Sequence, residues 1–312
     1  MNDQSALLPR TFEERLRAGR FVMTAEVTPP LSCDARDLIR TAAPLRGLAD
    51  AVNVTDGAGA RAHMGALAAA AILIGADIEP ILQLTCRDRN RIALQGDLMG
   101  AAALGIRNLL LLGGDDPKMG DQPETKPVFD LDSKTLIETA RRLRDEAVLP
   151  TGRTVAGKAA FFLGAADLPI DPPAGWEPSL LAAKAKAGAQ FVQTQFCMDA
   201  AIVRRYVGAL ADAGLTRQLA ILIGVNPLRS AKSAHWMKNH LYGTIIPEAL
   251  IARMERGAAE PTREGVRICV ELIEELATIP GVAGVHIMAP GNDAAIPEVI
   301  KAARARVHKA AV

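Results

Sequence analysis

The stretch LLLLGGDDP, residues 109–117, joins four consecutive leucines to two glycines and two aspartates. A second stretch, GAQFVQTQ at residues 188–195, also passes from apolar residues into polar ones and ends in Thr194 and Gln195. Parallel α/β enzymes build their sites in this way, because an apolar strand delivers polar groups at its carboxyl end. The pattern recurs along the chain, so it predicts both a parallel sheet and the place of the chemistry.

Short apolar runs alternate with longer amphipathic runs through the whole chain. The expected strands cover residues 21–27, 51–55, 79–84, 108–112, 157–163, 191–195, 219–224 and 283–288. The expected helices cover residues 35–46, 62–75, 88–104, 133–147, 177–187, 199–213, 247–256 with 261–277, and 292–309. These strand–helix units predict an α/β fold, a single (β/α)8 TIM barrel over residues 1–312, with residues 1–20 as an N-terminal extension or helix.

The main alternative to a closed barrel is an open, doubly wound sheet. The first expected strand leads into Thr28-Pro29-Pro30 rather than a G-x-G-x-x-G turn, which disfavours the open sheet. Two long polar segments, residues 113–132 and 164–178, follow expected strands, and loops of this length inside a domain are usually functional. In a barrel, all of the loops that follow strands meet at one mouth.

The bulk composition excludes several classes of protein. The 312 residues carry 36 basic and 35 acidic side chains, a net charge of +1, and aromatic residues make up 4%. This balance argues against nucleic acid or an anionic membrane as a partner. The N-terminal residues contain no apolar signal core, and no apolar run approaches the ~18 residues of a membrane span. The protein is therefore expected to be soluble and cytoplasmic.

Cysteine and histidine usage indicates neither disulfides nor a metal site. Cys33, Cys86, Cys197 and Cys269 form no C-x-x-C pair, and we expect reduced thiols. The five histidines are scattered along the chain, so no metal site is expected. His286 stands alone in an apolar strand and is interpreted as a satisfied core histidine.

Glu26 stands within the otherwise apolar strand FVMTAEV, residues 21–27. Loss of hydration there would raise the pKa of its carboxyl and make it a proton donor near neutral pH. The structural alternative is a glutamate paired with an arginine or lysine at the barrel mouth. The sequence leaves both interpretations open.

Other strand ends also carry groups with two interpretations. Asp115 follows two glycines, which would let a flat ligand approach while the carboxylate faces a developing positive charge. The alternative is an ordinary Gly-Gly-Asp-Asp-Pro turn. Thr194 and Gln195 would suit a heterocycle edge, because an amide both donates and accepts, or they satisfy barrel backbone. Lys184, near a helix end, is either solvated or reaches a phosphate.

Six segments in one order resemble the methylenetetrahydrofolate reductase family. They are AEVTPP, VNVTDGAGA, QLTCRDRN, LLLLGGDDP, GAQFVQTQF and GVNPLRSAKSA, and the match runs from about Phe21 to Ile300. The chain resembles bacterial members that consist of the catalytic domain alone. Such members are flavin-dependent (β/α)8 barrels that reduce 5,10-methylenetetrahydrofolate to 5-methyltetrahydrofolate in one-carbon metabolism and methionine biosynthesis. The resemblance implies an oxidoreductase acting on CH–NH donors, with FAD rather than FMN as cofactor and tetrahydrofolate derivatives as ligands.

The resemblance also implies roles for individual residues. Glu26 corresponds to the general acid that helps open the imidazolidine ring, and Asp115 to the aspartate that stabilises the 5-iminium cation. Gln195 corresponds to the glutamine that hydrogen-bonds the folate, so substrate binding falls to these three residues. The cofactor-binding residues implied in the same way are Thr55, Gln83, Gly113, Gly114, Asp115, Asp130 and Lys184.

The residue types also suit this chemistry when they are considered independently of the resemblance. Ring opening needs a proton on a weakly basic nitrogen, and therefore an uncharged acid. The resulting cation needs a nearby carboxylate that stays ionised. Two carboxyls whose pKa values are pushed apart meet both needs. Hydride transfer belongs to the flavin, while the protein supplies stacking and orientation.

Several positions depart from the family pattern. No aromatic occurs in PLRSAK, residues 227–232, where well-known members place a phenylalanine on which pyridine nucleotide and folate alternately stack. Gly113 replaces an arginine of the flavin loop, and Leu180 and Ala183 replace an asparagine and an arginine on the phosphate-binding helix. These departures point away from direct NAD(P)H oxidation and towards an electron-donating partner protein. A homo-oligomer is also expected.

Two other functions remain as alternatives. A folate-binding or carrier subunit would keep the folate groups and need a partner for catalysis, and the altered phosphate-binding helix favours it. An unrelated barrel lyase or aldolase is disfavoured, because no strand end carries a lysine suited to a Schiff base. Folate binding without flavin binding would favour the carrier over the reductase.

Overall fold

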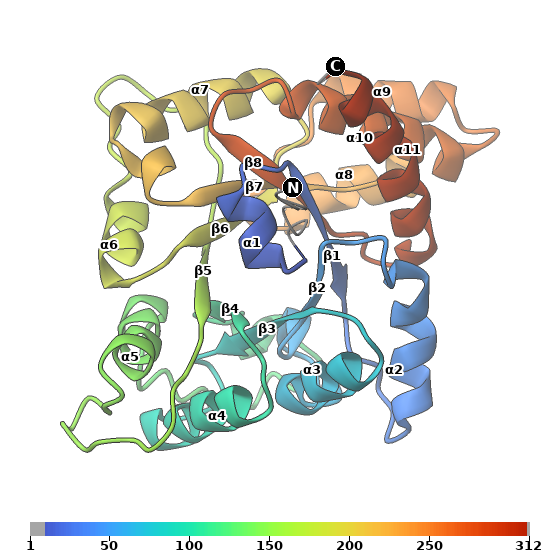
Figure 1. The fold of residues 1–312 in the computed structure, drawn as a ribbon. Coiled ribbons are helices and arrows are strands. Elements are labelled where there is room, and N and C mark those ends of the chain that lie inside the picture. The colour runs from blue at the N-terminus through green and yellow to red at the C-terminus, as the bar shows by residue number, and fades with distance from the viewer. Residues whose placement is uncertain (1–9, 311–312) are drawn as a thin grey trace, which may run out of the picture.

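A computed structural model, which describes residues 10–310, shows a closed barrel of eight parallel strands (Figure 1). The strands are β1 (Val22–Val27), β2 (Ala51–Val54), β3 (Pro80–Thr85), β4 (Asn108–Leu112), β5 (Phe162–Asp167), β6 (Phe191–Phe196), β7 (Ala220–Val225) and β8 (Val282–Ile287). Each strand pairs with the next, and β8 pairs with β1 to close the ring. The predicted (β/α)8 barrel is confirmed.

Helices surround the strands and connect them in order (Figure 1). They are α1 (Phe12–Arg17), α2 (Ala35–Ala42), α3 (Ala66–Gly75), α4 (Arg91–Ala103), α5 (Ser133–Asp145), α6 (Ser179–Ala187), α7 (Ala200–Asp212), α8 (Ala231–His240), α9 (Glu248–Arg256), α10 (Pro261–Leu276) and α11 (Ile296–Ala310). Short 3-10 helices are η1 (Ala43–Leu45), η2 (Ala58–Ala60), η3 (Pro117–Met119), η4 (Leu215–Arg217) and η5 (Asp293–Ala295). Among the described residues, no helix is both long enough and apolar enough to cross a bilayer.

The interior of the barrel is apolar at the amino end of the strands. Phe12 on α1 meets Phe162 and Phe191 at ring-centroid distances of 5.8 and 5.3 Å, and those two rings stack on each other at 5.0 Å. The same cluster contains Val22, Ala51, Ile81, Leu110 and Leu222. In Figure 1, α1 lies across this opening, so it closes the floor of the barrel. Residues 1–9 of the expected N-terminal extension lie outside the described residues.

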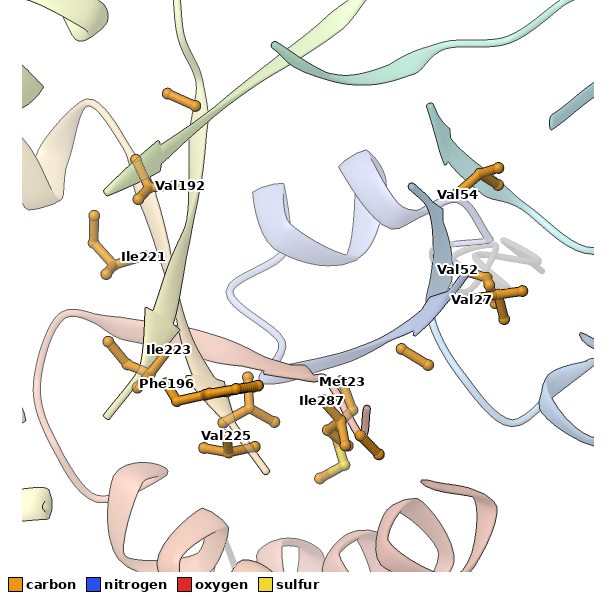
Figure 2. Packing of buried hydrophobic residues seen from close by; sticks show 14 of the residues in the cluster. Met23, Val27, Val52, Val54, Val192, Phe196, Ile221, Ile223, Val225 and Ile287 are labelled. Atoms are coloured by element: carbon orange, nitrogen blue, oxygen red, sulfur yellow. The ribbon is translucent and has the colours of Figure 1, made fainter. Parts of the chain in front are cut away.

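A second and larger core fills the space between the outer face of the barrel and the helices. Figure 2 shows part of it, with the labelled side chains Met23, Val27, Val52, Val54, Val192, Phe196, Ile221, Ile223, Val225 and Ile287. Successive side chains of a strand point to opposite faces, so the residues between these outward ones point into the barrel. That alternation decides which polar side chains can meet inside.

Two elements differ from the sequence expectation. The predicted strand over residues 157–163 is wrong, because β5 begins at Phe162. A Cβ at Gly164 would lie 2.3 Å from the Phe191 ring, so β5 must be small there, and its strand signal is weak. The sequence also predicts no helix at α8, which Ser230 starts through a capping box with Ser233. The other strands agree with expectation to within one residue at each end.

Candidate active site at the carboxyl end of the barrel

The barrel brings most of the predicted site residues to the carboxyl ends of its strands. Those at the mouth are Glu26 on β1, Thr55 after β2, Gln83 on β3, Gly113, Gly114 and Asp115 after β4, and Gln195 on β6. The carboxyl ends of parallel strands face the same way, so these groups share one end of the molecule. Asp130 and Lys184 lie further out, on the loop before α5 and on α6.

Glu26 faces the barrel interior with 22% of its side chain exposed. Its Oε2 accepts a hydrogen bond from Gln83 Nε2 at 3.3 Å and lies 3.5 Å from His286 Nε2. No arginine or lysine of residues 10–307 forms an ion pair with it. The partners of this carboxyl are therefore an amide and a histidine, and the arginine or lysine pairing that the sequence left open is not observed.

A layer of buried polar side chains lies beneath Glu26. Gln193 Nε2 lies 3.0 Å from both Thr24 Oγ1 and Asn53 Oδ1, and Asn53 Nδ2 donates to Gln193 Oε1 at 2.6 Å. His286 Nδ1 lies 3.0 Å from Thr24 Oγ1 and 3.3 Å from Gln193 Nε2. Because the groups satisfy one another, the layer can be buried without orphaned donors or acceptors. We call these four residues the polar layer.

The ring of His286 joins the polar layer to the mouth of the barrel. Its Nδ1 faces the hydroxyl of Thr24 and the amide of Gln193. Its Nε2 faces Glu26 Oε2 at 3.5 Å. The sequence placed His286 in the core, as observed, but gave no sign of this contact, which joins β8 to β1.

The turn after β4 brings Asp115 against the loop after β2. Asp115 Oδ2 accepts a hydrogen bond from the Gly59 N–H at 2.9 Å. Gly114 has a φ of +102°, and a Cβ there would lie 2.8 Å from Arg87 Cβ, so this position requires glycine. A Cβ at Gly113 would meet no atom within 4 Å. The backbone of this turn is therefore open to a flat ligand on one side.

Thr55 carries a polar atom that the protein leaves unused. Its hydroxyl is buried and has no hydrogen-bond partner among the described residues. Its N–H bonds to the carbonyl of Val27 at 3.2 Å, so the barrel fixes its backbone. A buried hydroxyl without a partner is uncommon, and either an ordered water or a ligand would satisfy it. The polar edge of an isoalloxazine ring fits this group.

Asp56 organises the loops after β2 and β3, a role that the sequence analysis missed. Its Oδ2 accepts from the N–H and the hydroxyl of Thr85 at 2.8 and 3.0 Å and pairs with Arg89. Arg87, which is 4% exposed, donates to the carbonyl of Gly57 at 3.1 Å. The charged run RDR at residues 87–89, directly after a strand, is the signal that could have indicated such a network.

Gln195 lies where the pairing register between β6 and β7 shifts. Thr194 Oγ1 accepts from the Gly224 N–H at 2.9 Å, so the threonine satisfies barrel backbone, one of the two roles considered for it. Gln195 Oε1 accepts from the Phe196 N–H at 3.0 Å, and its Nε2 donates to the carbonyl of Tyr242 at 3.3 Å. Such irregularities re-aim side chains beside functional sites.

Asp130 and Lys184, both predicted cofactor ligands, have other partners. Asp130 bonds to the backbone and guanidinium of Arg91 at 2.7–2.9 Å, and this pairing lowers the pKa of its carboxyl to about 2. Lys184 Nζ donates to the carbonyl of Ala166 at 2.6 Å. The ring end of a flavin therefore finds groups that fit it, whereas Asp130 and Lys184 would reach a flavin only after an exchange of these partners.

Two cysteines follow strands near the mouth, but neither suits a nucleophile. Burial raises the pKa of the Cys86 thiol to about 11 and that of Cys197 to about 12. Both thiols stay protonated at neutral pH, and protonated thiols react slowly. All four cysteines are free, as expected. In the part of the chain that the structure describes, no three His, Cys, Asp or Glu side chains are grouped to hold a metal ion.

Comparison with known proteins agrees with this arrangement. A family model described as methylenetetrahydrofolate reductase matches residues 11–304. The chain belongs to the methylenetetrahydrofolate reductase family. The resemblance seen in six short segments is thereby confirmed.

Curated relatives from this reductase family are longer than the chain. The probable methylenetetrahydrofolate reductase (NADPH) of Caenorhabditis elegans is 25% identical over 240 residues, which cover 75% of this chain and 33% of that protein. Methylenetetrahydrofolate reductase 2 of Schizosaccharomyces pombe is 27% identical over 206 residues, covering 64% and 31%. The chain thus spans about a third of the length of these relatives.

Solved structures with the same fold are more distant in sequence. An uncharacterised Clostridium thermocellum protein that binds two copies of 5-methyl-5,6,7,8-tetrahydrofolic acid superposes with a TM-score of 0.66 at 13% identity, covering 93% of this chain and 97% of that one. EDTA monooxygenase from Chelativorans sp. BNC1 gives a TM-score of 0.54 at 14% identity, covering 93% and 94%. At this identity the two likenesses show the barrel fold alone.

Proposed function

We propose that this chain reduces 5,10-methylenetetrahydrofolate to 5-methyltetrahydrofolate, or catalyses the reverse reaction, with a flavin as the hydride carrier. The observation that carries the proposal is the placement of Glu26, a carboxyl inside the barrel with Gln83 and His286 on one oxygen. Membership of the reductase family supports the reaction class. The folate-binding barrel from Clostridium thermocellum supports a folate ligand.

Glu26 acts as the acid of the proposed reaction. The five-membered ring of the substrate opens when the C–N bond breaks, and the departing nitrogen takes the proton of the carboxyl. Gln83 fixes the direction of that carboxyl, because it donates a hydrogen bond to Oε2, and His286 Nε2 lies 3.5 Å from the same oxygen. The other oxygen is left for the substrate, which is the geometry that general acid catalysis needs.

Asp115 stabilises the positive charge that ring opening creates. The product of that step is a 5-iminium cation, and a nearby carboxylate stabilises it electrostatically. The Gly59 N–H holds the Asp115 carboxylate, and the open side of Gly113 lets the flat pterin approach the turn. The two acids thus take different parts, one as proton donor and one as fixed negative charge.

The cofactor of the proposal is a flavin, with FAD preferred to FMN. When bound, the reduced flavin supplies the hydride for the exocyclic carbon. Thr55 and Gln83, together with the backbone of Gly113 and Gly114, would hold the ring, Lys184 would serve a phosphate, and Asp130 is a further cofactor-binding residue of the proposal. The NADPH in the name of the nematode relative is one possible source of electrons for the flavin, and a partner protein is another.

Reductive titration of the purified holoprotein tests the proposal. NADH, NADPH and 5-methyltetrahydrofolate are added in parallel while the flavin absorbance is followed. We expect methyltetrahydrofolate to bleach the flavin and methylenetetrahydrofolate to restore it. A flavin-saturated protein that responds to neither folate would contradict the proposal.

A second function, a folate-binding or carrier subunit, is favoured by one observation. Asp130 and Lys184, two of the residues predicted to bind the cofactor, are bonded to other parts of the protein. A carrier would bind methyltetrahydrofolate with the same Gln195 and Asp115 but take up no flavin. Calorimetric binding of the folate by a protein that cannot be loaded with FAD or FMN would select this function.

A further inference from the structure

The segment between α8 and α9 is fixed over the end of β6. The Ile245 N–H donates to the carbonyl of Phe196 at 2.9 Å, and the Met198 N–H donates to the carbonyl of Ile245 at 2.8 Å. These two bonds form a short parallel bridge beside Cys197, just past the end of the strand. The segment therefore belongs to the carboxyl end of the barrel, where the predicted folate-binding residue Gln195 lies.

The course of the chain just before this bridge is also fixed. Gly243 has a φ of +75°, a conformation that side chains other than glycine rarely adopt. A Cβ at Gly243 would lie 2.5 Å from Leu168 Cδ2, so the turn packs closely on the loop after β5. The Thr244 N–H donates to the carbonyl of Leu241 at 3.2 Å and closes the turn. Tyr242 is thus held at one place in this turn.

Tyr242 has an exposed side chain and a backbone contact with a predicted site residue. Its side chain is 84% exposed, whereas Tyr206, the other tyrosine, is fully buried. Its carbonyl accepts the hydrogen bond from the side-chain amide of Gln195 at 3.3 Å. The Tyr242 ring therefore branches from a backbone position next to the Gln195 amide. An amide suits the edge of a heterocycle and an aromatic ring suits its face, so the two side chains are complementary.

We propose that Tyr242 is a folate-binding residue, whose ring stacks on the pterin while Gln195 bonds the pterin edge. The inference rests on the proposed function, because it assigns a further contact within the same site. The loss of an aromatic ring from a stack of this kind weakens binding by about ten-fold or more. The Tyr242 side chain makes no hydrogen bond among the described residues, and only the backbone carbonyl of Tyr242 contacts Gln195. We therefore expect replacement of the side chain to leave the fold unchanged.

Calorimetric titration with 5-methyltetrahydrofolate tests the inference in Tyr242→Ala and Tyr242→Phe. We expect Kd to rise about ten-fold in the alanine variant and to change by less than about two-fold in the phenylalanine variant, which keeps the ring. Trp236→Ala is the matched control. Trp236 is also exposed, at 54%, but its ring stacks on His240 at 5.1 Å, and the hydrogen bonds of the Gln195 side chain in the described residues go to Phe196 and Tyr242 instead. The control should bind as the parent does.

A second probe, 6-methyltetrahydropterin, lacks the aminobenzoylglutamate part of folate and locates the stack. An equal loss of affinity for both probes in Tyr242→Ala supports stacking on the pterin. A loss confined to the complete folate would overturn it, as would unchanged affinity for both probes. If the parent protein binds neither probe, the proposed function fails and this inference fails with it. Unchanged binding in Tyr242→Ala beside normal binding by the parent rejects this inference alone.

Discussion

The two ends of the barrel interior are built by the same strands but have opposite chemistry. Along β1, Val22, Thr24 and Glu26 point inward in turn, and each step of two residues moves from the apolar floor to the polar layer and then to the mouth. Along β6, Phe191 and Gln193 make the same change. The floor is filled by stacked rings, and the next level by groups that bond one another.

This difference separates the part of the barrel that mainly stabilises the fold from the part that orients the proposed site. The floor gains from apolar burial, which depends on volume and hardly on direction. The polar layer gains little net energy, because its hydrogen bonds replace bonds to water, but it fixes directions. His286 and Gln83 then aim the carboxyl of Glu26. Substitutions at each end should show whether turnover and the free energy of unfolding can be lowered separately.

The largest effect is expected at the mouth, from Glu26→Gln. Glutamine keeps the size and the contacts with Gln83 and His286 but cannot give a proton. We expect folate turnover to fall by about 10²–10⁴-fold, the usual contribution of a general acid, while folate binding and the free energy of unfolding stay near those of the parent. Rapid-mixing measurement of flavin reoxidation by methylenetetrahydrofolate checks this. Unchanged turnover would remove Glu26 from its role.

The next largest effect is expected at the floor, from Phe191→Ala. Loss of this ring leaves a cavity beside Phe12 and Phe162, and we expect the free energy of unfolding to fall by about 3–5 kcal/mol. Urea unfolding measures it. Ile92→Ala is the control, since Ile92 is 77% exposed and should change stability by less than about 0.5 kcal/mol. Equal effects at the two positions would show that the floor contributes no special stability.

A change in the polar layer should affect both properties to a smaller extent. Gln193→Leu leaves the buried side-chain amide of Asn53 without a partner, and we expect a loss of about 1–3 kcal/mol in unfolding free energy. Turnover should fall by less than in Glu26→Gln, because His286 loses its contact with Gln193 but keeps the one with Thr24. Gln218→Leu, at an exposed position, is the control. A more stable Gln193→Leu protein would show that the layer is not satisfied as described.

The smallest effect is expected on the rim of the mouth, from Asp130→Asn. The bond with Arg91 lowers the pKa of this carboxyl from 3.8 to about 2, so the ionised pair stabilises the fold above pH ~4 and loses its effect as the pH falls towards 2. The variant should therefore be less stable than the parent at neutral pH, and the difference should shrink on acidification. Thermal unfolding at several pH values measures this.

The same variant distinguishes a structural from a cofactor role for Asp130. Flavin affinity that stays at the parent value would show that the carboxylate serves Arg91 alone. A clear loss of flavin affinity would support the role that the family resemblance implied.

The ends of the strands could be predicted from the sequence because their signals are local. LLLLGGDDP shows its strand, its turn and its carboxylates within nine residues, and β4 begins and ends where expected. Glu26 was visible in the same way, as a charged residue in an apolar run. The position of β5 was not predicted, because small residues give a weak strand signal. The small residue at Gly164 is required by the Phe191 ring on the next strand, and not by the neighbours of Gly164 in the sequence.

The polar layer could not be predicted, since its contacts are not local. Gln193 and Asn53 are 140 positions apart in the chain, and Thr24 and His286 are 262 positions apart. Each of these residues looks like an isolated polar side chain in an apolar strand. Only the closed barrel shows that they meet, and that His286 reaches Glu26.

The pairing of β8 with β1 has a consequence for how the protein is made. His286 pairs in register with Thr24, so the histidine beside Glu26 is synthesised with the last strand of the barrel. Contacts between such distant parts of a chain form late and slowly during folding. During synthesis Glu26, the proposed acid, is therefore present long before His286, and the two meet only when β8 pairs with β1.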